Sequence, residues 1–172
     1  DGGNLRNAIP REAHIILGVP TSHAEAFEND AKAFGEVLCA EFALVEKNAK
    51  VEVTKVDAPA TVLSAATQRN LLLALLSVPS GVLAMSAAMP GLVETSTNLA
   101  SVKFREDEIV ITTSQRSSVE SAKEYAKMAV ESVFLLAGAE VEHSDGYPGW
   151  APNTDSHLLK VTVDSYKNLF GV

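Results

Sequence analysis

The sequence of 172 residues predicts an α+β fold in which helices pack on one face of a mostly antiparallel sheet. Two observations lead to this prediction. Apolar residues recur at three- and four-residue spacings in several long segments, which is typical of helices with one buried face. In mid-chain, the segments 92–104 and 108–115 resemble strands and are separated only by a short charged turn, which predicts a hairpin. That hairpin breaks the strand–helix alternation that a doubly wound parallel sheet needs.

The first half of the chain predicts two strands and two helices. Residues 13–19 (AHIILGV) form a short apolar run closed by Pro20, which indicates a buried strand. Ser22 and Glu25 have capping-box spacing and mark the expected start of a helix. In chain order, the expected elements are a strand at 13–19, a helix from 22 to about 47, a half-buried strand at 51–56 and a helix at 60–76.

The second half predicts the hairpin, two helices and a short strand. Ser117 and Glu120 form a second capping box, and Gly138 follows the last apolar residue of that helix, where a left-handed residue is common. Asp155 is the expected cap of the last helix. In chain order, the expected elements are a loop at 81–91, strands at 92–104 and 108–115, a helix to residue 136, a strand at 140–143 and a C-terminal helix.

Composition excludes several classes of protein. Lys and Arg number 14 and Asp and Glu number 22, so the net charge of −8 argues against a nucleic-acid partner. The single cysteine, Cys39, excludes a disulfide framework and fits a reducing, cytoplasmic compartment. Apolar runs such as 71–76 are far shorter than the roughly 20 residues that span a bilayer, so no membrane segment is expected. The chain begins without Met or a signal peptide, and we expect a piece of a longer protein.

Two groups of residues suggest chemistry. Arg116 follows a β-branched strand where a helix begins, and a guanidinium there can bind a carboxylate through two parallel hydrogen bonds or form a surface salt bridge. The residues alone leave both alternatives open. A second hypothesis is a zinc site formed by His143, Asp145, Asp155 and His157. Because both pairs flank a loop, nothing in the sequence fixes their geometry.

Four motifs in the same order resemble one enzyme family. They are GGNLRNAIPREA at 2–13, GLVETSTNL at 91–99, QRS at 115–117 followed by Ser121, Lys123 and Tyr125, and LAGA at 136–139 followed by YPGWAP at 147–152. Together they are similar to the aminoacyl-histidine dipeptidases (Xaa-His dipeptidase, peptidase D), zinc exopeptidases related to carnosinases. Since the motifs cover most of the chain, the resemblance is specific.

The resemblance implies a lid or dimerisation domain with a ferredoxin-like α+β fold. Residues 1–146 would be that lid, incomplete at its N-terminus, and residues 147–172 a junction loop and the first helix of a catalytic domain that this chain lacks. The family hydrolyses dipeptides such as β-alanyl-histidine with two zinc or other divalent ions held by the catalytic domain. We therefore expect no catalytic metal site in this chain, and no activity from it alone.

The resemblance also implies site residues. Asn7 matches an asparagine whose amide binds the substrate, and Arg116 matches the arginine that binds the C-terminal carboxylate of the dipeptide when the lid closes. Pro148, Gly149 and Trp150 match a loop at the domain junction. Substrate contact and packing at the junction are the two alternatives for this loop, and packing is at least an equal alternative for Trp150. One departure concerns the residue before the arginine, which is often isoleucine in the family and is Gln115 here.

The expected partners are a dipeptide, the absent catalytic domain and a second copy in a homodimer. Two alternatives remain at this point. The chain could be a non-catalytic α+β binding or dimerisation module whose edge strands pair with another copy. It could also be a small metal hydrolase that uses the four residues of the hypothetical zinc site.

Overall fold

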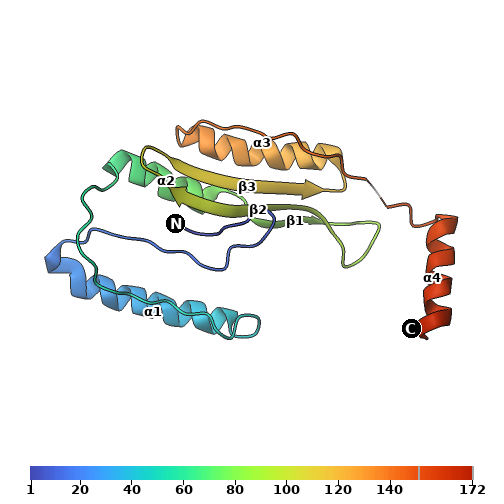
Figure 1. The fold of residues 1–172 in the computed structure, drawn as a ribbon, viewed down its shortest axis with the longest axis horizontal. Coiled ribbons are helices and arrows are strands. Elements are labelled where there is room, and N and C mark those ends of the chain that lie inside the picture. Colours follow the sequence, from blue (N-terminus) through green and yellow to red (C-terminus); the bar gives the residue numbers. More distant parts are fainter. Residues whose placement is uncertain (151, 172) are drawn as a thin grey trace. The chain divides into compact units, whose positions relative to one another are not determined.

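The computed structural model describes residues 1–150 and 152–171 of the chain. The elements in chain order (Figure 1) are a 3₁₀ helix η1 (Thr21–His23), α1 (Ala24–Phe42), α2 (Ala65–Ser77), β1 (Gly81–Met85), β2 (Val93–Phe104), β3 (Ile109–Ser117), α3 (Glu120–Leu136) and α4 (His157–Phe170). Two compact units result: Ile15–Ser64 forms one, and Asp1–His14 joins the described residues from Ala65 onward in the other. No helix in the described ranges is long and apolar enough to cross a membrane.

The sheet has the strand order β1-β2-β3, and both pairs of neighbours are antiparallel. The β2–β3 hairpin confirms the prediction for mid-chain, and its turn is closed by the Arg105 N–H, which donates to the Glu108 carbonyl at 2.9 Å. The register places Asn98 opposite Ser114 and Ser96 opposite Arg116. With helices and an antiparallel sheet in one chain, the predicted α+β class is confirmed.

The N-terminal segment continues the sheet where β1 ends. β1 pairs with β2 only between Val93 and Thr97. Farther along β2, Gly2 and Val102 exchange two backbone hydrogen bonds of 2.9 and 3.0 Å, and the Phe104 N–H donates to the Asp1 carboxylate at 2.7 Å. The first residues of the chain therefore satisfy backbone groups of β2 that β1 does not reach.

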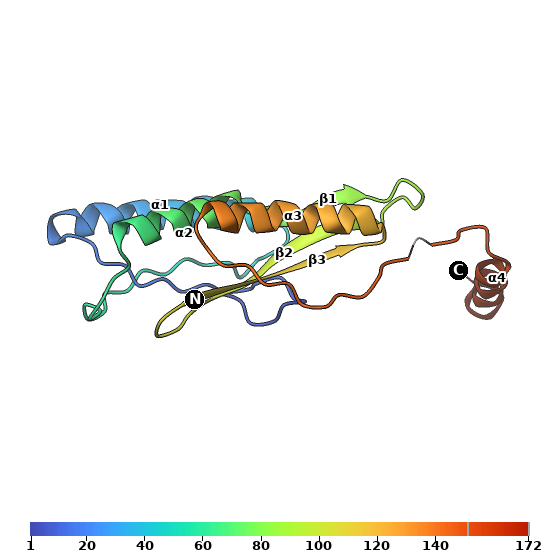
Figure 2. The ribbon, with the colours of Figure 1, turned by 90° about the horizontal axis from the view of Figure 1, so that it is seen from above.

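The core lies between the sheet and two helices. α3 packs on β2 and β3, α2 contacts α3, and both helices lie on one side of the sheet (Figure 2). Four buried side chains form this core: Ala74, Val78, Val130 and Phe134. Leu99 and Ile111 of the sheet pack against it. The prediction that helices pack on one face of the sheet is confirmed, and so is the predicted end of α3, where Gly138 adopts a φ of +80°.

The unit Ile15–Ser64 is built around α1. Gly35 is the buried residue of this helix, and a Cβ at this position would lie 2.9 Å from the Cβ of Val51. The Cys39 thiol donates to the carbonyl of Ala49 at 3.1 Å. The segment after α1 therefore runs back along the helix as an irregular chain.

Three predicted strands were wrong. Residues 13–19, 51–56 and 140–143 are irregular, apart from a single bridge between Ala13 and Gly2. Ile15 and Ile16 are 75% and 68% exposed. An apolar run forms a strand only when a neighbouring strand satisfies its backbone groups, and in residues 1–150 and 152–171 these segments pair only at Ala13 and His14, with Gly2 and Asp1. Conversely, the loop predicted at 81–91 begins with a strand, β1, because β2 pairs with it.

The predicted helix starts were also corrected. α1 begins at Ala24 after η1, so Ser22 does not cap it, and the helix ends at Phe42 rather than near residue 47. α2 begins five residues later than predicted, at Ala65. α3 begins at Glu120, with Val119 as its N-cap.

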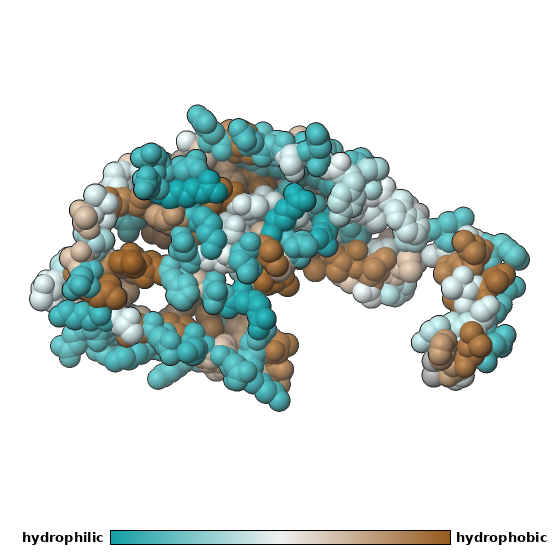
Figure 3. All heavy atoms as spheres, viewed as in Figure 1, coloured by the Kyte–Doolittle hydropathy of each residue, from teal (hydrophilic) through white to brown (hydrophobic). Residues whose placement is uncertain are grey.

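The last helix is capped by a neighbour of the predicted residue. The hydroxyl of Ser156, and not Asp155, accepts from the Leu159 N–H at 3.1 Å. Apolar side chains such as Leu158 and Leu169 are 76% and 77% exposed, and Figure 3 shows apolar surface gathered on α4, at the right of the view. α4 is thus an amphipathic helix whose apolar side chains are largely exposed.

Candidate functional site

Arg116 lies on the face of the sheet that α3 does not cover. Successive side chains of a strand point to opposite faces. Because Ile111 packs against the helix-covered core, Thr113 and Gln115 share its face, whereas Ser114 and Arg116 face the other way. Arg116 is exposed and is paired across the sheet with Ser96. Its guanidinium is therefore available to a ligand on this face.

Gln115 makes its contacts on the helix-covered side. Its side-chain amide donates to the hydroxyls of Thr97 at 3.1 Å and Thr113 at 3.0 Å. The departure from the family pattern before the arginine thus points away from Arg116, and its polar group has partners there.

Asn7 lies in a turn that is fixed to the same face. The Ala8 N–H donates to the Leu5 carbonyl at 3.2 Å and closes the turn. The side-chain amide of Asn98 donates to the carbonyl of Ala8 at 2.9 Å and to that of Arg6 at 3.5 Å. Since Asn98 pairs with Ser114, which shares a face with Arg116, the exposed Asn7 is brought to the side of the sheet that carries Arg116.

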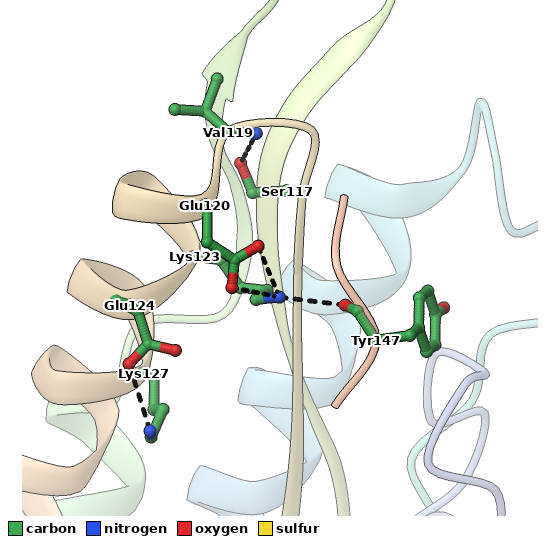
Figure 4. A network of polar contacts seen from close by, with 7 residues as sticks. All are labelled: Ser117, Val119, Glu120, Lys123, Glu124, Lys127 and Tyr147. Carbon is green, nitrogen blue, oxygen red and sulfur yellow. Dashed lines mark hydrogen bonds and ion pairs between the residues drawn. The ribbon is translucent and has the colours of Figure 1, made fainter. Parts of the chain in front are cut away.

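A third segment, residues 147–150, is fastened beside Arg116. Lys123 of α3 lies 2.7 Å from the Glu120 carboxylate and donates to the carbonyl of Tyr147 at 3.0 Å, as Figure 4 shows. Gly149 packs so closely on the carbonyl of Ser117 that a Cβ there would collide with it. The chain that leaves α3 therefore returns to the end of β3, one residue from Arg116.

The corner between β3 and α3 is held by polar contacts. The Ser117 hydroxyl accepts from the Val119 N–H at 3.0 Å and lies 2.9 Å from the hydroxyl of Thr95 (the Val119 contact is drawn in Figure 4). The hydrogen bond from Lys123 lowers the pKa of Glu120 below its ordinary value of 4.5. At neutral pH this carboxylate is thus charged and pairs with the lysine that holds the returning segment.

Of the three junction residues, Gly149 has a clear structural role, in its packing on Ser117. Trp150 is 77% exposed and Pro148 is also exposed. Both follow directly from the segment anchored by Lys123. Their rings therefore lie at the surface of the described structure.

The hypothetical zinc site is not assembled. His143 Nε2 lies 3.3 Å from the carboxylate of Glu131 on α3, whereas Asp155 and His157 lie at the start of α4. In the described part of the chain, no three His, Cys, Asp or Glu side chains come together in a way that could hold a metal ion. The alternative of a small metal hydrolase built from these four residues was wrong, because His143 is engaged by α3 instead.

Two residues of this region were missed from the sequence, Asn98 and Lys123. A signal for Asn98 was present, since asparagine is disfavoured within strands and its occurrence in a β-rich segment indicates a side-chain role. Lys123 also stands in one of the four motifs, but its role depends on Tyr147, which is distant in sequence.

Known dipeptidases are similar to this chain in both sequence and structure. No protein-family model matches the chain. The cytosol non-specific dipeptidase of Escherichia coli (strain K12) is 32% identical over 170 residues, which is 99% of this chain and 35% of that protein. The crystal structure of aminoacylhistidine dipeptidase from Vibrio alginolyticus superposes with a TM-score of 0.91 at 33% identity, over 99% of this chain and 35% of that one. The chain is a homologue of these dipeptidases.

The resemblance to the aminoacyl-histidine dipeptidases predicted from four motifs is thereby confirmed. The chain spans about a third of the length of the dipeptidases that it matches. Homology to these dipeptidases extends over nearly the whole chain and so includes the Asn7 turn, β3 with Arg116 and the 147–150 segment.

Proposed function

We propose that this chain is the lid part of a metal-dependent dipeptidase that hydrolyses Xaa-His dipeptides such as β-alanyl-histidine. The observation that carries the proposal is the placement of the Asn7 turn and Arg116 on one face of the sheet, in a chain homologous to dipeptidases over nearly its whole length. Residues 1–146 would form the lid, and residues 147–172 would lead into the catalytic domain.

Arg116 and Asn7 each suit one polar group of a dipeptide substrate. A free dipeptide ends in a carboxylate, and the planar guanidinium of Arg116 can bind it through two parallel hydrogen bonds, which a lysine cannot reproduce. Asn7 offers a neutral amide, which can donate to a carbonyl oxygen of the same substrate. Ser96, opposite Arg116, and Asn98, which holds the Asn7 turn, are two residues apart, or about 7 Å along a strand. Arg116 and the Asn7 turn are therefore attached at neighbouring positions on one face of the sheet.

Zinc or another divalent ion would be held by the catalytic domain, since the described residues of this chain do not gather a ligand set. The metal would supply Lewis-acid activation of water and of the peptide carbonyl. This chain would contribute binding, orientation and, on closure over the substrate, exclusion of water. We place the enzyme in the cytoplasm, in line with the single cysteine.

Replacement of Arg116 in the full-length protein tests the proposal. Arg116→Ala should lower kcat/KM for β-alanyl-histidine roughly ten- to a hundredfold, the equivalent of a lost charged hydrogen bond of about 1.5–3 kcal/mol. Metal content should not change. Arg116→Lys should recover only part of the loss, because lysine lacks the fork geometry.

A substrate change makes the test specific for the carboxylate. The wild type should strongly prefer the free dipeptide to its C-terminal amide, and Arg116→Ala should lose most of that preference. Arg105→Ala is the matched control, because Arg105 pairs with Glu108 at 3.0 Å in the hairpin turn. Unchanged discrimination in Arg116→Ala would refute the carboxylate role. Absence of dipeptide hydrolysis by the wild type, together with self-association, would favour the non-catalytic dimerisation module.

A further inference from the structure

We propose that Asn98 is a positioning residue that sets the place of Asn7 relative to Arg116, an inference that rests on the proposed function. Asn98 would not itself contact the substrate. Its side chain would act by holding the turn that presents Asn7, and so would fix the spacing between the two substrate-binding groups.

The geometry around Asn98 supports this role directly. A side-chain amide has two N–H donors, and Asn98 directs its amide nitrogen to the carbonyls of Arg6 and Ala8, the two residues that flank Asn7. Both partners are acceptors, which settles which end of the amide faces the turn. One half-buried side chain therefore holds the backbone carbonyls of the residues before and after Asn7, the proposed substrate-binding residue.

The other ties of the N-terminal segment lie farther from Asn7. Asp1 and Gly2 are held by Phe104 and Val102, near the far end of β2. Gly3 packs against the backbone of Ala100 with a φ of +63°. Asn98 is the next attachment along the strand, and it holds the two residues that flank Asn7. Without it, the turn would keep its internal bond from Ala8 to Leu5 and lose its connection to the sheet face.

The position of Asn98 on β2 links the turn to Arg116. Asn98 pairs with Ser114, and the adjacent pair on the same face is Ser96 with Arg116. The β2–β3 ladder has no bulge between these two pairs, since its register shifts only beyond Leu99. The spacing between the turn and Arg116 is therefore fixed by a continuous stretch of antiparallel sheet.

The effect on catalysis should be large relative to one hydrogen bond. Displacement of a substrate-positioning group by about 1 Å can cost on the order of 100-fold in rate. In the full-length enzyme, Asn98→Ala should therefore lower kcat/KM for β-alanyl-histidine about 10- to 100-fold. Asn98→Asp keeps the shape but points acceptors at two carbonyls, so it should be at least as damaging.

A double-mutant cycle separates positioning from a general structural role. If Asn98 acts through Asn7, the Asn7→Ala/Asn98→Ala double variant should be no slower than Asn7→Ala alone. Asn70→Ala is the matched control, because the Asn70 amide also donates to a distant carbonyl, that of Ala137 at 3.1 Å, away from the site. It should lower the thermal midpoint by a similar amount and leave kcat/KM unchanged.

Each other outcome would overturn the inference. Wild-type kinetics of Asn98→Ala beside a slow Asn7→Ala would show that the turn needs no anchor. Full multiplication of the two losses would show that Asn98 acts independently of Asn7. Failure of both Asn98 variants to fold would make the residue a folding determinant. If Asn7→Ala itself is fully active, the proposed function loses its Asn7 contact, which is a separate failure.

Discussion

The β2–β3–α3 region and the Ile15–Ser64 unit have similar apolar patterns and differ in burial. In the first, Phe134 is 7% exposed and packs in the core between α3 and the sheet. In the second, Phe34 occupies the apolar stripe of α1 and is 62% exposed. A stripe of apolar residues stabilises a fold only where another surface covers it. The comparison shows that the ordered core of this chain is concentrated in one of its two units.

Removal of one phenyl ring from each region should give the largest difference in the free energy of unfolding. Phe134→Ala creates a cavity in the core, and we expect it to lower the free energy of unfolding by about 3–5 kcal/mol. Phe34→Ala removes an exposed ring and should cost roughly 0.5 kcal/mol or less. Urea denaturation of the chain followed by circular dichroism would measure both. Equal losses would break the comparison, since they would reveal a second core around α1.

A matched pair of glycines should give the next largest contrast. Gly3→Ala places a Cβ against the Ala100 carbonyl oxygen and forces a non-glycine residue to a φ of +63°, so the segment must leave the sheet edge. The left-handed conformation alone costs roughly 1–2 kcal/mol.

Gly35→Ala brings a Cβ to 2.9 Å from the Val51 side chain, in a segment outside any strand that can shift. The helix gains about 1 kcal/mol from the same change, so the net effect should be near zero. Hydrogen exchange at Val102 and Phe104 would check the first variant and thermal unfolding the second. A strong destabilisation by Gly35→Ala would show that the 51–56 segment is firmly fixed.

The smallest effect should come from the polar corner at α3. Because Lys123 lowers the pKa of Glu120, the charged carboxylate stabilises the native state at pH values above 4.5, and this contribution disappears as pH falls through the lower, native pKa. Glu120→Gln should therefore reduce the thermal midpoint slightly at pH 7 and not at all at strongly acidic pH. A difference between the two proteins that persists in acid would show that Glu120 acts through packing rather than charge.

Local sequence predicted the hairpin, α3 and the glycine at its end, because each depends on neighbours close in the chain. The hairpin needs a short turn, and the end of α3 needs a residue that tolerates positive φ at position 138. The same reasoning failed for 13–19 and 51–56, because strand formation requires a partner that no local pattern names. It also placed caps at Ser22, Ser117 and Asp155. The structure has a 3₁₀ helix at Thr21–His23 instead, Val119 as the N-cap of α3, and Ser156 as the cap of α4.

The candidate site, too, was predicted from the sequence only in part. Arg116 and Asn7 were found through motifs, which are properties of the sequence. Their placement on one face was decided by the β2–β3 register and by the Asn98 amide, which joins residues 90 and 92 positions apart. Contacts between such distant residues follow from tertiary packing, which is why the roles of Asn98 and Lys123 were not predicted although both lie in the motifs.

The sequence by itself determined the α+β class, the central hairpin, the acidic charge and the resemblance to the dipeptidases. Each of these rests on composition, short-range periodicity or an ordered set of motifs. Only the tertiary structure decided which apolar segments are buried, that the first residues complete the edge of β2, and that Asn7 and Arg116 share one face. These features depend on backbone hydrogen bonds and side-chain contacts between distant segments, which form only when the chain is folded.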